Sequence, residues 1–294
     1  MLWAVFTLIA AAAQTARNAM QRELTATLGT VGATHVRFLF GFPFALLFLA
    51  GVTIALGESL PRPPLAFWPW VLAGAFTQIA ATATMLSVMG QRSFVVSYAF
   101  IKTEPIHVAL FGLIFLGDKV TVLSAAAILI ATAGVIVISL KPGVSQLSTV
   151  RSTVIGLMSG ALFGLSAIAY RGGILTLHLQ DFVLAATFTV SVGLVIQAAT
   201  LSLYLWLRDR KVLSDIMRAW RPSLFAGFMG AFASEFWFLG FAITSAANVR
   251  TLALVEVLFA QGVTHFVFKQ PTTTRELSGV VLVVIGVALL VWAY

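Results

Sequence analysis

The sequence predicts an all-α integral membrane protein with ten transmembrane helices, built as two inverted five-helix repeats. Of its 294 residues, 60% are hydrophobic and 10% are charged, whereas soluble domains carry about 25% charged residues. Ten apolar segments approach the length of about 20 residues that a helix needs to cross a bilayer. The first five segments resemble the last five, and an odd number of crossings per copy inverts the second copy.

The ten segments are separated by short joints that carry charged residues, glycine or proline. We expect the helices at residues 2–22, 33–56, 66–90, 94–116, 121–140, 153–172, 181–207, 222–244, 247–268 and 275–293. The first is interpreted as a helix and not a signal peptide, because no basic region precedes its apolar run and no convincing cleavage site follows. Arg171-Gly172-Gly173 is expected to end the sixth helix, and the longest polar joint runs from Arg208 to Arg221.

An internal repeat is visible when the sequence is shifted by 152 residues. This shift places Glu104 on Glu256 and Gly134 on Gly286, within similar apolar surroundings. We therefore expect one five-helix repeat at residues 1–142 and a second at 150–294.

Loop lysines and arginines predict the orientation, because they accumulate on the cytoplasmic side. One set of joints holds eleven: Arg22, Arg92, Lys141, Arg151, Arg208, Arg210, Lys211, Arg218, Arg221, Lys269 and Arg275. The opposite joints hold three: Arg62, Lys119 and Arg171. This places both termini on the non-cytoplasmic side of an inner (plasma) membrane that the chain crosses many times.

Composition also excludes several classes of function. The chain has no cysteine, which excludes disulfides, Cys-ligated zinc and iron–sulfur clusters. The net charge of +8 lies mostly in short loops and does not indicate a nucleic-acid partner. There is no Walker-type phosphate loop and no hydrolase or metalloprotease motif. We expect neither an enzyme nor a bound cofactor or metal.

A charged, proline-broken stretch, Ile101–His107, lies within the fourth apolar segment. Ionisable residues at such depth are costly and usually face a bundle interior or a cavity. Pro105 cannot donate a helical hydrogen bond, and transporters build midplane sites at broken helices. Glu256 is the counterpart in the second repeat.

Three carboxyl groups, those of Glu104, Glu235 and Glu256, fall deep within expected helices. Each is a candidate for contact with a substrate ammonium group or for proton coupling. The alternative for Glu104 and Glu256 is a structural ion pair with Lys102, Arg37 or Arg250.

Lys102 stands two residues from Glu104, so in a regular helix the two would point to nearly opposite sides. Either the helix is broken there or Lys102 has another partner, and a substrate carboxylate is one candidate. His107 shares a face with Glu104 and is either a proton relay or a satisfied core histidine. His35 and His265 are expected to be structural.

Other polar side chains are candidates for a cavity lining. Gln14, Arg17 and Asn18 form a polar face on the first segment, with Arg17 expected to reach toward the cytoplasmic surface. Gln14 and Gln78 either line a cavity or hydrogen-bond between helices. Among the aromatic residues the candidates are Tyr98, Phe163, Tyr170 and Trp237. Gly156, Gly160 and Gly164 indicate close helix packing, within a monomer or across a weak dimer.

Ten helices, a five-plus-five repeat and the corner Phe115-Leu116-Gly117-Asp118-Lys119 resemble the drug/metabolite transporter (DMT) superfamily. Its EamA-type members join the fourth and fifth helices of a repeat with a similar leucine-glycine-acid-basic corner. In the second repeat, Phe268-Lys269-Gln270-Pro271 departs from that corner. Within the superfamily the chain looks most like the YddG-type amino-acid exporters.

The resemblance implies a secondary transporter that exports amino acids, including aromatic or apolar ones, or related small metabolites by alternating access. A cavity with both signs of charge suits an amino acid. The alternatives are a proton-coupled multidrug or other metabolite exporter and, in different classes, a channel or a membrane sensor. The expected partners are a small-molecule substrate, the lipid bilayer and, for a coupled exporter, protons.

Overall fold

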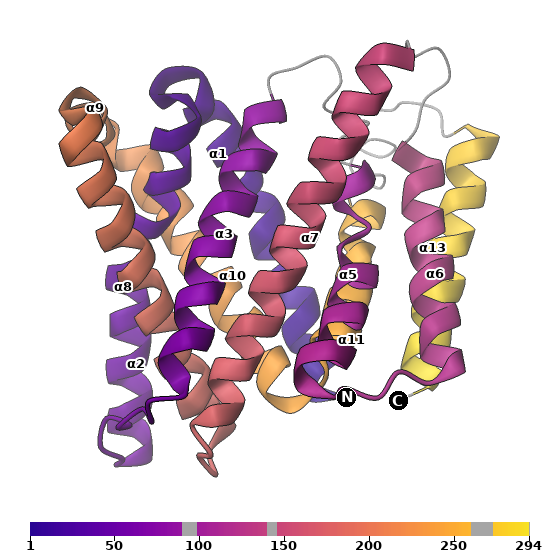
Figure 1. Ribbon diagram of the computed structural model, residues 1–294, viewed down its shortest axis with the longest axis horizontal. Coiled ribbons are helices and arrows are strands. Elements are labelled where there is room, and N and C mark those ends of the chain that lie inside the picture. Colours follow the sequence, from indigo (N-terminus) through magenta and orange to yellow (C-terminus); the bar gives the residue numbers. More distant parts are fainter. Residues whose placement is uncertain (90–98, 140–145, 260–272, 294) are drawn as a thin grey trace.

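The chain folds into a bundle of helices that run roughly side by side (Figure 1). The computed structural model describes residues 1–89, 99–139, 146–259 and 273–293. Within these ranges it contains helices and no strand, and eight segments are long and apolar enough to cross a membrane. The expected helix at 247–268 falls partly outside the described residues, as does His265.

The first half contains α1 (Leu2–Leu39), α2 (Phe42–Leu56), α3 (Phe67–Met89), α5 (Glu104–Phe111), the π-helical turn η1 (Gly112–Leu116) and α6 (Val122–Ser139). The second half contains α7 (Gln146–Thr176), α8 (Phe182–Arg208), α9 (Arg210–Arg218), α10 (Trp220–Ile243), α11 (Ala246–Leu252), the 3₁₀ turn η2 (Ala253–Val255) and α13 (Thr274–Trp292).

Two boundaries differ from expectation. The joint expected between residues 22 and 33 is a kink within α1 at Gly29, whose φ of +68° suits glycine. The expected end of the sixth helix at Arg171–Gly173 is wrong, because α7 continues to Thr176. A Cβ atom at Gly172 would lie 2.6 Å from the Trp70 ring, so this glycine permits close packing of α7 on α3.

The segment from Arg208 to Arg221, expected to be a polar joint, contains a helix, α9. Val212, Leu213 and Ile216 lie on one face of it and pack near Leu24 and Leu28 of α1. Their three- and four-residue spacing is the signal that would have predicted it.

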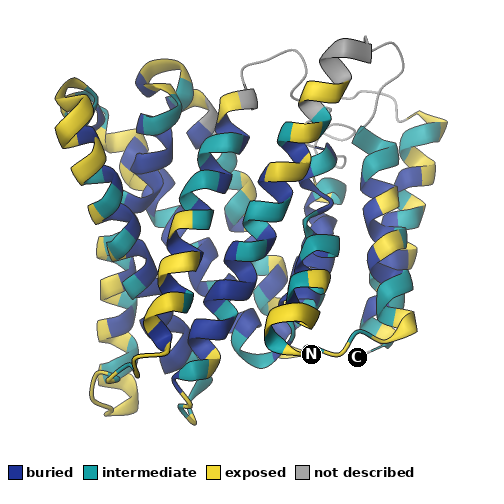
Figure 2. Ribbon diagram, in the orientation of Figure 1, coloured by how far each residue is buried: buried dark blue, intermediate teal, exposed yellow. Residues whose placement is uncertain are grey.

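Helices from the two halves pack against each other in a reciprocal pattern. The main interfaces join α1 to α10, α3 to α7 and α6 to α13, and α5 also contacts α11. Buried residues face inward along these interfaces, while exposed residues lie on the outer faces (Figure 2). Many of the exposed side chains are large and apolar, including Leu47, Ile54 and Leu207, as expected of surfaces that face lipid.

The small-residue ridge on α7 packs within the monomer. A Cβ atom at Gly160 would lie 2.9 Å from the carbonyl oxygen of Ile101, and one at Gly164 would lie 3.1 Å from the His107 Cβ atom. The ridge therefore lets α7 approach the segment that carries Lys102 and Glu104.

Candidate substrate site

The helix is interrupted between Ile101 and Glu104, as the sequence allowed. Lys102 and Thr103 form a turn, and α5 begins at Glu104. Pro105 lies in the first turn of α5, where its missing N–H group costs no intrahelical hydrogen bond. Because of this break, Lys102 and Glu104 both reach the same pocket although only one residue separates them.

The second half has an irregularity at the corresponding position. There the 3₁₀ turn η2 immediately precedes Glu256. The carboxyl groups of Glu104 and Glu256 thus both follow a local departure from α-helical geometry.

Two ion pairs cross between the halves. Arg250 of α11 lies 3.0 Å from the Glu104 carboxylate, and Lys102 pairs with Glu256. All four residues are buried or nearly so, and the Arg250 guanidinium lies 4.5 Å from the centre of the Trp237 ring. Both glutamates therefore form ion pairs with cations that the sequence offered as partners.

Gln14 of α1 connects this cluster to α10. Its side-chain oxygen accepts a hydrogen bond from the Trp237 indole at 3.2 Å, and its amide nitrogen donates to Glu256 at 3.4 Å. Gln78 of α3 accepts a 2.8 Å hydrogen bond from Gln197 of α8. Both glutamines make helix–helix hydrogen bonds and also line the pocket.

Arg17 and Arg37 are both buried within the site. Each is only 2% exposed, so the expectation that Arg17 reaches the membrane surface is wrong. A Cβ atom at Gly230 of α10 would lie 3.1 Å from Arg37 Cγ and 3.4 Å from Arg17 Cδ, which places the two side chains together over this glycine. Arg17 donates to Asn18 at 2.7 Å, and Arg37 donates to Thr82 and Ser234 at 3.4 Å each.

The pocket bounded by these side chains is narrow, with a volume of about 30 Å³. It is lined by Gln14, Arg17, Asn18, Arg37, Gln78, Met85, Ile101, Lys102, Glu104, Phe163, Trp237 and Arg250. Such a volume holds only one or two water molecules. A solute would have to separate these side chains in order to enter.

Several other candidates lie away from the lining. The Nδ1 of His107 lies 3.1 Å from the carbonyl oxygen of Thr103, which can only accept, so this nitrogen carries the proton. Tyr170 is 1% exposed and packs against Phe238, with ring centroids 4.7 Å apart. Glu235 accepts a hydrogen bond from Thr187 of α8. Tyr98 lies outside the described residues.

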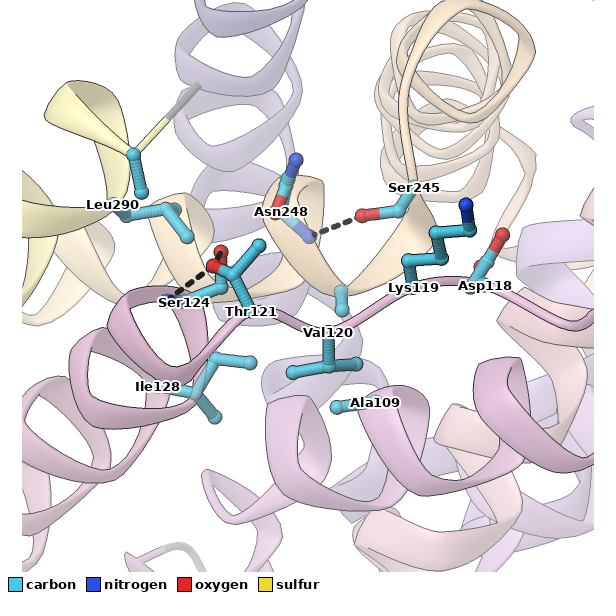
Figure 3. A pocket seen from close by; sticks show the side chains of 12 residues that line it. Ala109, Asp118, Lys119, Val120, Thr121, Ser124, Ile128, Ser245, Asn248 and Leu290 are labelled. Carbon is cyan, nitrogen blue, oxygen red and sulfur yellow. Dashed lines mark hydrogen bonds between the residues drawn. The ribbon is translucent and has the colours of Figure 1, made fainter.

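A second pocket, of about 210 Å³, lies where the α5–α6 joint meets the start of α11. Figure 3 shows Asp118, Lys119 and Thr121 on this joint, opposite Ser245 and Asn248. Asp118, the acidic residue of the corner motif, lies 3.3 Å from Arg171, which also donates to the carbonyl oxygen of Thr244 at 3.0 Å. The corner is thereby tied to α7 and to the end of α10.

The second half of the chain matches a known protein family. Residues 150–292 match the EamA-like transporter family. This family belongs to the DMT superfamily, and the EamA-like match covers nearly all of the second expected repeat. One crystal structure aligns with a TM-score of 0.70 over 99% of this chain and 96% of its own, at 14% identity, which shows a shared fold alone. Among curated proteins, none matches the sequence.

Proposed function

We propose that the protein is a secondary transporter that exports amino acids or related small metabolites across the inner membrane by alternating access. The observation that carries this proposal is the pair of buried ion pairs, Glu104–Arg250 and Lys102–Glu256, each joining the two halves of the chain. Ionisable side chains buried among apolar helices are characteristic of substrate and ion pathways. The EamA-like match of residues 150–292 supports the same function.

The two halves are proposed to be inverted repeats, with domains at 1–142 and 150–294. The reciprocal packing of α1 on α10 and α3 on α7 supports this symmetry, because it exchanges the first and third helices of one repeat with those of the other. Gly134 and Gly286, which the repeat shift aligns, both lie at the α6–α13 interface, where each packs against the opposite helix. Rocking of one repeat against the other would break and re-form the ion pairs between them.

The N- and C-termini lie at the same end of the bundle (Figure 1), as an even number of crossings requires. We propose that this is the non-cytoplasmic end, following the bias of loop lysines and arginines. Arg171, Asp118 and Thr244 then close the outer end of the pathway.

Glu235 is the proposed proton-coupling residue. It is 7% exposed, and one of its carboxyl oxygens has no hydrogen-bond partner among the described residues. A carboxyl group there that releases and takes up a proton would change the charge between α8 and α10 without breaking either ion pair in the pocket.

Purified protein in liposomes loaded with a pool of labelled amino acids and small organic acids tests this function. We expect selective efflux from wild type, faster with a pH gradient, and no efflux from the Glu104→Gln variant. Glu235→Gln is expected to keep efflux but lose its response to the gradient, while Asp215→Asn, on exposed α9, keeps both. Absence of efflux for every solute would contradict the transport function, and an unchanged gradient response in Glu235→Gln would contradict coupling at that residue.

A further inference from the structure

The central pocket has an excess of positive charge. Arg17, Arg37, Lys102 and Arg250 surround it, whereas the carboxylates that contact its lining are those of Glu104 and Glu256. All ten carboxylate side chains of the sequence fall in the described ranges, and the third buried one, Glu235, lies outside the lining and bonds to Thr187. With every group charged, the pocket carries a surplus of two positive charges.

Arg37 is the clearest part of this surplus. Its side chain is 2% exposed, its two hydrogen bonds go to neutral hydroxyl groups at 3.4 Å, and its Nε has no hydrogen-bond partner among the described residues. Arg17 and Arg250 are close enough to repel it electrostatically. A guanidinium group stays protonated in proteins, so Arg37 cannot relieve this repulsion by losing its charge.

A buried cation among other cations favours a bound anion, because an uncompensated charge is costly to take out of water. The fork of N–H donors on a guanidinium group matches the oxygens of carboxylates and phosphates. We infer that the pocket selects a small organic dianion, such as a dicarboxylate or a phosphate monoester, over zwitterionic amino acids. The dianion would neutralise the surplus of two charges, with Arg37 as its principal contact.

This inference rests on the proposed transport function and narrows its substrate class. A zwitterion brings no net charge and would leave the surplus in place. The lining already accommodates carboxylate groups beside its cations, since Glu104 and Glu256 place carboxylate oxygens against Arg250 and Lys102.

Binding to the purified protein tests the selectivity, with tryptophan fluorescence as the readout and ionic strength held constant with chloride. The probes are succinate, glycerol 3-phosphate, leucine and phenylalanine. We expect at least one dianion to bind at least tenfold more tightly than either amino acid, and Arg37→Gln to weaken that binding at least tenfold. Arg218→Gln removes the same charge from an exposed side chain and should leave the affinity unchanged.

A second measurement needs no ligand. Ser234→Asp would place a carboxylate beside Arg37, and the matched variant Ser234→Asn would not. We expect Ser234→Asp to have a higher unfolding temperature than Ser234→Asn. We expect Arg37→Gln to have a higher unfolding temperature than wild type, since each of these changes lowers the surplus of positive charge in the pocket.

The inference is overturned if the amino acids bind as tightly as the dianions, or if chloride alone produces the full change in tryptophan fluorescence. It is also overturned if the affinity of Arg37→Gln for the dianion is within twofold of the wild-type affinity. It is also overturned if Ser234→Asp unfolds at a lower temperature than Ser234→Asn. Efflux of zwitterions from liposomes would contradict the selectivity for a dianion while leaving the transport function intact. Failure of all transport would contradict the transport function itself.

Discussion

Glu104→Gln is expected to abolish transport and to lower the free energy of unfolding by about 3–5 kcal/mol, the usual cost of removing one partner from a buried ion pair. The loss arises because Arg250, 8% exposed and 3.0 Å from Glu104, would remain charged beside Lys102 and Arg37. Equilibrium unfolding in detergent, followed by tryptophan fluorescence, measures this loss of unfolding free energy.

The double variant Glu104→Gln/Arg250→Gln is the decisive control. Removing both charges leaves neither member of this pair without its partner, so the double variant should be more stable than the Glu104→Gln variant. The exposed pair Asp215–Arg218, with atoms 3.5 Å apart, provides the comparison, because Asp215→Asn should cost less than about 1 kcal/mol. A Glu104→Gln protein as stable as wild type would show that the pair does not hold the halves together.

Gly134→Val and Gly286→Val are expected to destabilise the protein by about 1–3 kcal/mol or more, as overpacking a tight interface does. A Cβ atom at Gly134 would lie 2.7 Å from the Gly279 carbonyl oxygen and the Val283 nitrogen. At Gly286 it would lie 2.5 Å from the Ala131 nitrogen. These are backbone atoms, so α6 and α13 must move apart to make room.

Gly51→Val is the matched control for both, because a Cβ atom at Gly51 would meet nothing within 4 Å. It places the same side chain within the exposed part of α2. Thermal unfolding of the three variants in one detergent gives the comparison. Equal unfolding temperatures would mean that α6 and α13 do not pack as closely as described.

Much of the site could be predicted from the sequence because buried charges in an apolar chain are few. Glu104, Glu256 and Lys102 were recognised by their depth, and the break before Pro105 explains how Lys102 and Glu104 reach one pocket. The ion-pair partners could not be decided, because a sequence does not say which of several cations lies across the bundle.

The burial of Arg17 and Arg37 could not be predicted for a different reason. Both stand near the ends of expected helices, where arginine usually extends to the membrane surface. Both are instead buried, where they pack together over Gly230 of α10. Gln197, the partner of Gln78, was also missed, although a lone amide in the middle of an apolar segment is a signal of hydrogen bonding in the bundle.

Accessibility of the pocket from both sides of the membrane tests the central claim most directly, and a chain without cysteine is suited to it. Met85→Cys places one thiol in the pocket lining, and Ala186→Cys places one in the closed core of α8. With membrane-impermeant thiol reagents, we expect the first to be labelled from either side, in separate experiments, and the second from neither. Labelling of Met85→Cys from only one side, or from neither, would contradict alternating access through this pocket.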